Sequence, residues 1–189
     1  MKLYGKGGRA FRCLWMLEEA GVDYEHILTD WAAGDSRTPE FLAINPNGKI
    51  PVLIDEDLRL FESLAINYHL ARKYAPQMWV ANTKDESLAI QWLAWGLGEL
   101  EGPHDAANRG EHNIDTDRFR ISLDALRRVL SHQTYILGSK FTVVDLNTAS
   151  LLLRPQYRSV IVDDTDLRGW FKACTSRPTL EQAMSITAS

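Results

Sequence analysis

The chain has 189 residues, of which 45% are hydrophobic and 24% are charged, a composition typical of a globular protein with one large or two small domains. Its net charge of −4 is shared evenly by residues 1–76 and the remainder, which argues against binding to nucleic acid or to an anionic membrane surface. The sequence shows no secretory leader pattern and no apolar run near the ~20 residues that span a bilayer, so we expect a cytoplasmic protein.

The cysteines and histidines do not indicate a metal site or a disulfide. Cys13 and Cys174 stand far apart, each within a helical pattern, which is typical of small buried thiols in a reducing compartment. The chain has no CxxC pair, no HExxH motif and no cluster of histidines with carboxylates. We therefore expect neither a bound metal ion nor a redox-active cysteine pair.

The first part of the chain predicts a β-α-β unit. Residues 2–4 form a short strand, the glycine-rich residues 5–8 form a turn, and from Arg9 the apolar positions follow the period of a helix that ends at Gly21. Residues 24–28 alternate as a second strand, and a long connection with a short apolar turn at residues 41–42 follows.

Residues 45–63 carry the most informative pattern. A cluster of turn residues over 45–48 precedes the apolar run 50–54, a buried strand that Pro51 interrupts near its start. Residues 55–57 turn the chain and residues 58–61 alternate as a returning strand. Glu62 and Ser63 then stand directly before a helix over residues 64–74.

This pattern suggests a clamp for a small anionic peptide. If the Ile50–Pro51 peptide bond is cis, the N–H and C=O groups of Ile50 point away from the strand ladder and can pair with an extended peptide. Ser63 can cap the following helix, whose first N–H groups can bind a carboxylate. The alternative is that Pro51 only starts an edge strand and that Ser63 is only a cap.

Composition changes after residues 74–77, which marks a domain boundary. The remainder predicts helices alone, about five in number, among them residues 86–100, 118–130 and a buried helix through Leu153. Thr142 and Asp145 form a capping box at the start of that buried helix, with Phe141 as the staple residue. A further helix includes residues 167–174 and ends at Arg177-Pro178.

Four stretches in matching order and spacing resemble the cytosolic glutathione transferase family: LYG followed by RAFRCLWMLEEAGVDYE, NPNGKIPVL, LFESLAINYHLARKY and FTVVDLNTASLL. The resemblance covers nearly the whole chain. It implies a thioredoxin-like domain over residues 1–76, with α/β structure and a mixed four-stranded sheet, followed by an all-α helical-bundle domain over residues 77–189. It also implies a homodimer and a role in detoxification.

The resemblance implies a binding site for glutathione. Pro51 matches the family's cis-proline, and Ile50 matches the residue whose backbone pairs with the cysteinyl part of the ligand. Glu62 and Ser63 match the acid and hydroxyl that hold the γ-glutamyl end, where a carboxylate answers an ammonium and a helix start answers a carboxylate. Lys49 stands where the family often places a Gln or Lys toward the ligand backbone.

The glycyl carboxylate of glutathione would need a cation or donor from the connection before the clamp. Trp31 and Arg37 are both candidates, and the sequence does not choose between them. The electrophile is expected between the two domains, with walls from about Trp95 to His112. Within that stretch, His104 and Asn108 are further candidates for polar contacts, as is His112 itself. The short C-terminus suggests an open cleft and a loose choice of substrate.

The chain departs from the family at the residue that activates the thiol. The family uses a Tyr, Ser or Cys after the first strand, whereas residues 5–9 read GKGGR. The serine-type position falls on Gly7 or Gly8, and the cysteine-type position falls near Arg9. Tyr4 lies one residue from the tyrosine-type position, and we interpret it as a strand aromatic. Cys13 lies a turn further into the helix, and we interpret it as a core residue.

This departure leaves two interpretations open. In the first, the thiolate is stabilised by N–H groups at Gly8, by the helix dipole and by Arg9. The protein then conjugates glutathione to a small, mostly apolar electrophile, or supports a glutathione-dependent reduction. In the second, it binds glutathione or a partner protein without much catalysis, and Arg9 is only a solvated cation. A thioredoxin-type disulfide reductase is disfavoured because the loop has no CxxC pair.

Overall fold

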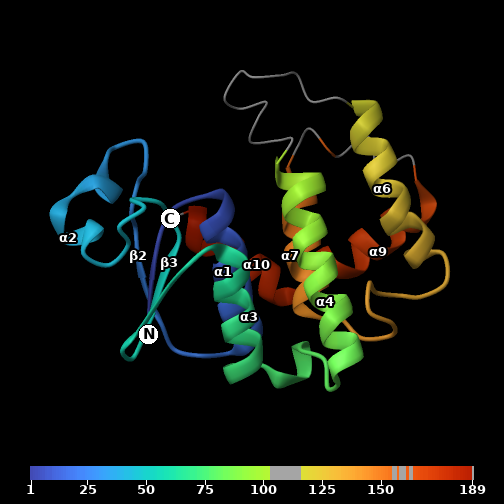
Figure 1. Cartoon of the computed structure of the whole chain (residues 1–189), viewed down its shortest axis with the longest axis horizontal. Helices are drawn as coiled ribbons and strands as arrows, with labels where there is room; N and C mark the ends of the chain where they lie inside the picture. The colour runs from blue at the N-terminus through green and yellow to red at the C-terminus, as the bar shows by residue number, and fades with distance from the viewer. Residues whose placement is uncertain (103–115, 155–156, 158–160, 162–163, 189) are drawn as a thin grey trace. The chain divides into compact units, whose positions relative to one another are not determined.

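The structure, a computed structural model, describes residues 1–102, 116–154, 157, 161 and 164–188. The chain divides into two compact units, Met1–Pro76 with Arg177–Ser189, and Gln77–Ser176. We call these unit 1 and unit 2 and treat each by itself (Figure 1). The domain assignments 1–76 and 77–189 stay predictions. The last helix of the chain, after Arg177, belongs to the compact unit 1 and not to unit 2.

Unit 1 contains a mixed four-stranded sheet, which confirms the expected fold class. Its strands are β1 (Lys2–Tyr4), β2 (Glu25–Ile27), β3 (Val52–Asp55) and β4 (Leu58–Phe61), in the order β2-β1-β3-β4. β1 pairs in parallel with β2 and antiparallel with β3, and β3 pairs antiparallel with β4. Leu3 of β1 faces Leu53 of β3, and both side chains are fully buried.

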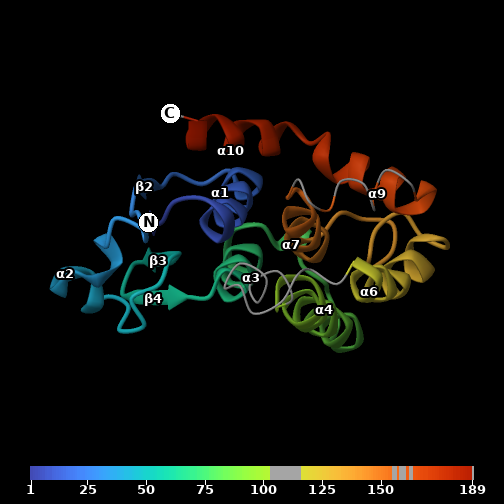
Figure 2. The same cartoon turned by 90° about the horizontal axis from the view of Figure 1, so that it is seen from above.

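Helices cover both faces of this sheet. α1 (Gly8–Ala20) and α3 (Ser63–Tyr74) lie on one face, and the short helices η1 (Asp35–Arg37) and α2 (Pro39–Leu42) lie on the other (Figures 1 and 2). α1 packs against α3, and the apolar side chains between these helices and the sheet are fully buried. The apolar residues of this core include Leu3, Leu14, Leu17, Leu53, Ile66 and Leu70.

The C-terminal helix was not expected from the sequence. Pro178 was interpreted only as the end of a helix, but it is the first residue of α10 (Pro178–Ala188), a position where the missing N–H of proline costs nothing. α10 packs on α1 (Figure 2). Arg177 holds its start by donating to both carboxylate oxygens of Glu19, at 2.5 and 2.6 Å. Trp15 also donates to Glu19, at 3.2 Å.

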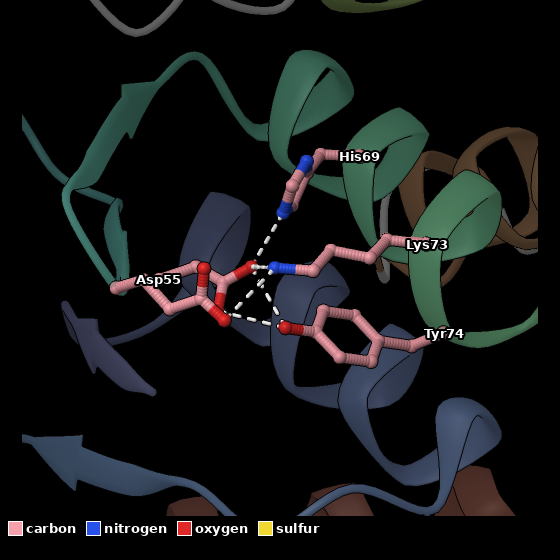
Figure 3. A network of polar contacts seen from close by, with 5 residues as sticks. Asp55, His69, Lys73 and Tyr74 are labelled. Atoms are coloured by element: carbon pink, nitrogen blue, oxygen red, sulfur yellow. Dashed lines mark hydrogen bonds and ion pairs between the residues drawn. The ribbon is translucent and has the colours of Figure 1, made fainter.

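A buried aspartate joins the sheet to α3 (Figure 3). Asp55 was expected in a turn, but it is the last residue of β3 and its side chain is only 4% exposed. Its carboxylate lies 2.7 Å from Nε2 of His69 and accepts from Nζ of Lys73 at 2.9 Å. It also accepts from the hydroxyl of Tyr74 at 2.8 Å. Burial opposes ionisation, but these hydrogen bonds hold the pKa of Asp55 at about 2.

Unit 2 is helical in its described residues. η2 (Pro76–Met78) leads into it, followed by α4 (Thr83–Trp95), α6 (Thr116–Leu130), α7 (Val143–Leu152) and α9 (Thr165–Thr175). The helix expected over residues 86–100 begins earlier, because Asn82 caps it by accepting from the N–H of Asp85 at 3.0 Å. Its last part is a π-helix, η3 (Gly96–Glu101).

The capping box at the start of α7 is confirmed. The side chain of Thr142 accepts from the N–H of Val144, and the carboxylate of Asp145 accepts from the N–H of Thr142 at 3.0 Å. Asp145 also accepts from the N–H of Ile136 and from the indole N–H of Trp170, both at 2.9 Å. Burial raises the pKa of this carboxyl group, although these hydrogen bonds oppose the shift. Asp145 thus gathers three segments of unit 2 around one side chain.

Candidate functional site

The clamp predicted at Pro51 has the expected backbone. The Ile50–Pro51 peptide bond is cis, as the sequence-based hypothesis supposed. The pairing of β3 with β1 begins only at Val52, which faces Tyr4, so Ile50 stands outside the strand ladder. Pro51 is buried and Ile50 is half-buried. The backbone of Ile50 is therefore placed where a ligand strand can pair with it.

A rigid turn sets the position of Lys49, just before the cis-proline. The side chain of Asn45 is fully buried, and its amide donates to the carbonyl of Lys49 at 2.7 Å. The same side chain accepts from the N–H of Asn47 at 3.1 Å. Gly48 adopts the left-handed conformation, with φ of 58°, and its N–H donates to the carbonyl of Asn45. The ammonium-bearing side chain of Lys49 itself is exposed.

Of the two candidates for the glycyl carboxylate, only Arg37 is placed against this turn. The hydroxyl of its neighbour Ser36 donates to the carbonyl of Gly48 at 2.9 Å. A guanidinium nitrogen of Arg37 lies 2.8 Å from the position that a Cβ on Gly48 would take. Trp31 lies in a separate turn, with 59% of its surface exposed. The structure thus brings Arg37 and the turn before Lys49 together.

Glu62 and Ser63 form the junction between β4 and α3. Glu62 holds the N-cap position and Ser63 is the first helical residue, so the expectation that Ser63 caps the helix is wrong by one residue. The reason is the backbone of Glu62, whose φ of 69° and ψ of 110° are not helical. Such angles cost a non-glycine residue about 1–3 kcal/mol and are concentrated at functional sites. No residue pattern indicates this strain, because Glu is not a residue that favours positive φ.

The first turn of α3 presents backbone donors beside this junction. Its first helical hydrogen bond runs from the N–H of Ile66 to the carbonyl of Glu62, at 3.0 Å. The N–H groups of residues 63–65 precede that bond and point out of the helix start. Ser63 is only 3% exposed, whereas Glu62 is exposed. A buried hydroxyl, a helix start and a carboxylate therefore meet within two residues.

Two contacts tie this junction to α1. The thiol of Cys13 lies 3.7 Å from the carbonyl oxygen of Ser63, and the amide of Asn67 donates to the carbonyl of Arg12 at 3.1 Å. Cys13 is fully buried, and burial raises the pKa of its thiol far above the usual range. It is therefore a core thiol, as expected, and not a thiolate nucleophile.

The loop between β1 and α1 lies beside the cis-proline. A Cβ on Gly5 would lie 2.7 Å from Cβ of Ala10 and 3.5 Å from both Cβ of Ile50 and Cα of Pro51. Only glycine fits there. α1 begins at Gly8, after the N-cap Gly7, and its first helical bond runs from Phe11 to Gly7 at 2.9 Å. The N–H groups of residues 8–10 precede that bond and form the helix start.

The remaining sequence candidates contribute less to the described site. Tyr4 pairs within the sheet and meets Phe41 edge-on at 6.2 Å, which agrees with its interpretation as a strand aromatic. His104, Asn108 and His112 lie outside the described residues. Among the residues that are described, no group of three His, Cys, Asp or Glu side chains is arranged to hold a metal ion. None of the helices in the same part of the chain is long and apolar enough to cross a membrane.

Comparisons with known proteins match nearly the whole chain. The family profile described as "Glutathione S-transferase, N-terminal domain" matches residues 1–72, and that of the C-terminal domain matches residues 105–178. Glutathione S-transferase 4 of Zea mays is 30% identical over 94% of this chain and 89% of its own length. A glutathione S-transferase I bound to lactoylglutathione superposes with a TM-score of 0.85 at 27% identity, covering 98% of both chains. A structure of the maize enzyme I with an atrazine–glutathione conjugate gives a TM-score of 0.84 at 26% identity, covering 99% of this chain and 97% of that one.

Proposed function

This chain belongs to the cytosolic glutathione S-transferase family, and on that premise we propose that it conjugates reduced glutathione to a small, mostly apolar electrophile. The observation that carries the proposal is the place of Ile50, which stands outside the strand ladder just before β3 and directly beside the glycine loop that begins α1. It supports a site in which an extended tripeptide lies with its thiol toward the start of a helix.

The γ-glutamyl end of glutathione is assigned to the start of α3. Its α-carboxylate accepts hydrogen bonds from the hydroxyl of Ser63 and from the first N–H groups of the helix, which favour a negative charge. Its ammonium takes the carboxylate of Glu62, whose exposed side chain stands one residue earlier. The cysteinyl part takes the backbone of Ile50, held by the cis bond to Pro51. Each ligand group thus meets a protein group of the opposite character.

The glycyl carboxylate is assigned to Arg37 with Lys49. The contact of Ser36 and Arg37 with Gly48 supports this choice over Trp31, because it joins a guanidinium to the turn that carries Lys49. A planar guanidinium can bind a carboxylate through two parallel hydrogen bonds, whereas an indole offers one N–H. Two cations near the glycyl end also balance the net negative charge of the tripeptide.

The thiol is assigned to the start of α1. A free thiol has a pKa near ~8.5, so catalysis at neutral pH needs a site that favours the thiolate. The N–H groups of Gly8 and Arg9, the helix dipole and the Arg9 charge provide that preference without a hydroxyl. The thiol proton passes to solvent. The sulfur lone pair then forms the S–C bond, and the electrophile either expels its leaving group with the bonding electrons or accepts them in an addition.

The second candidate is a glutathione-binding or protein-interaction module that catalyses little. The absence of Tyr, Ser and Cys from residues 5–9 favours this candidate. Without such a side chain, only backbone N–H groups and the Arg9 charge are left to lower the pKa of the thiol. A homodimer and a cytoplasmic location are part of the proposal for either candidate. If the second candidate binds glutathione, it differs from the first in what happens to the thiol after binding.

Steady-state conjugation of a chromogenic aryl halide tests the proposal. The wild-type protein should form the thioether, and Glu62→Gln should raise the KM for glutathione by about tenfold or more, because a charge-assisted contact to the ammonium is lost. Glu56→Gln is the matched control, since Glu56 is also an exposed glutamate with positive φ but lies in the β3–β4 turn. Binding of glutathione without any conjugation would favour the second candidate, and equal KM values for both variants would remove Glu62 from the site.

A further inference from the structure

His26 makes a hydrogen bond that neither the family resemblance nor the sequence pattern assigned. It lies half-buried in β2, and its Nε2 is 2.8 Å from the carbonyl oxygen of Gly5. A carbonyl oxygen only accepts, so Nε2 carries the proton and donates it, which fixes the tautomer. The N–H of Gly5 donates to the carbonyl of Ile27 at 3.1 Å. Consecutive residues of one strand therefore hold both polar groups of Gly5.

Gly5 is the point where the glycine loop meets the cis-proline. It adopts a φ of 150°, and a Cβ there would overlap Ala10 at 2.7 Å and touch both Ile50 and Pro51 at 3.5 Å. Any rotation of the Gly5–Lys6 peptide must therefore move the loop relative to these neighbours. Between Gly5 and the first helical residue stand only Lys6 and Gly7, so the orientation of this peptide is passed directly to the start of α1.

A second side-chain contact of the loop comes from Lys6. Glycines at positions 5, 7 and 8 give its backbone an unusually large conformational freedom. Lys6 forms an ion pair with Asp30 at 3.0 Å, but the two side chains are 61% and 37% exposed, and such pairs contribute little. The half-buried bond from His26 is the stronger of these two side-chain restraints, because it is shielded from water.

We propose that His26 is a positioning residue for the thiol-facing loop. Its bond to the Gly5 carbonyl sets the Gly5–Lys6 peptide plane and thereby aims the N–H groups of Gly8 and Arg9 at one point. This inference rests on the proposed function, which gives those N–H groups a thiol to stabilise. In a loop without a hydroxyl or thiol of its own, activation depends on backbone orientation, and His26 supplies it from a neighbouring strand.

Three variants test the proposal. His26→Leu removes the donor, and His26→Gln retains an N–H that can reach the carbonyl. His69→Leu is the control, because His69 is also a half-buried histidine of unit 1. It lies in α3 and contacts Asp55, not the loop. Amide hydrogen exchange is measured at Gly5 and Phe11, whose N–H groups hold the two ends of the loop. The fraction of bound glutathione present as thiolate is measured by ultraviolet absorbance at neutral pH.

We expect His26→Leu to speed exchange at Gly5 and Phe11 by about fivefold, the effect of one neutral hydrogen bond, and to lower the ratio of thiolate to thiol by a similar factor. kcat should fall more than KM rises. His26→Gln should restore most of both signals, and His69→Leu should change exchange in α3 and not selectively in the loop.

Unchanged exchange at Gly5 and Phe11 in His26→Leu would overturn the proposal, because the hydrogen bond from His26 would then not restrain the loop. Faster exchange with an unchanged thiolate fraction would overturn it as well, since His26 would then be only a structural contact. If the wild-type protein holds no thiolate, the proposed function fails separately, and the exchange data alone decide whether His26 fixes the loop.

Discussion

Two regions of unit 1 are assigned to glutathione in the proposed function, and their backbones are held in different ways. The backbone of the clamp segment, residues 45–63, is held by the buried amide of Asn45 and by the carboxylate of Asp55. The peptide bond before Pro51 is cis. The activator loop, residues 5–9, offers three glycines, one lysine and one arginine. In the proposed function, the side chains of Arg37, Glu62 and Ser63 join backbone groups in binding glutathione. The activator loop would offer its thiol only the N–H groups at the start of α1 and the Arg9 charge.

The largest effect that separates the two kinds of position is expected within the loop itself. Gly5→Ala should destabilise unit 1 by about 3 kcal/mol, because its Cβ would overlap Ala10 and its φ of 150° disfavours a side chain. Gly8→Ala should be neutral or slightly stabilising, since a Cβ at Gly8 has open space among the described residues and alanine favours a helix. Urea unfolding of both variants measures the difference. Equal stabilities would mean that Gly5 is not packed against Ala10 as described.

The next effect concerns the support of the clamp segment. The pKa of Asp55 is about 2 in the folded protein and near ~3.9 in an unfolded chain, so its contribution to stability is present above about pH 4 and is lost as the pH falls toward 2. Asp55→Asn should therefore lower the free energy of unfolding by about 2 kcal/mol at pH 7 and by about half as much at pH 3. Asp57→Asn, in the exposed turn, is the control. A loss that is the same at both pH values would contradict the role of the charged network.

The smallest expected effect separates the contribution of the Arg9 charge from that of the backbone N–H groups in the activator loop. Arg9→Gln keeps the helix start but removes a cation from its first turn, so the pKa of the bound glutathione thiol should rise by about half a unit, a roughly threefold loss of thiolate at neutral pH. A pH titration of the thiolate absorbance measures this shift, with Arg59→Gln on the exposed strand β4 as control. A shift of two units or more would place the activation on the Arg9 charge and not on the N–H groups.

Much of unit 1 could be predicted because its signals are local. Residues 2–4 and 58–61 alternate clearly and form β1 and β4 with the expected bounds. Pro51 indicated a break ahead of a strand, and β3 indeed begins one residue after it. The capping box of Thr142 and Asp145 was visible for the same reason, since both partners lie within one helical turn.

What the sequence did not reveal depends on contacts between distant segments or on backbone angles. Asp55 looks like a turn residue until β3 and α3 bring His69 and Lys73 to it, 14 and 18 residues later. α10 packs on α1 from the far end of the chain, which no local pattern indicates. The strained backbone of Glu62 has no sequence signal, and neither does the contact of His26 with Gly5, which requires the register of two strands.

The protonation state of bound glutathione decides whether the start of α1 activates the thiol. Reduced glutathione is titrated into the wild-type protein at neutral pH, and the ultraviolet absorbance of the thiolate is followed across a pH series. If the start of α1 activates the thiol, bound glutathione ionises well below its free pKa of ~8.5, so that thiolate is present at pH 7. Glutathione that binds but remains protonated up to its free pKa would contradict activation by the start of α1 and would leave a binding module in place of the proposed enzyme.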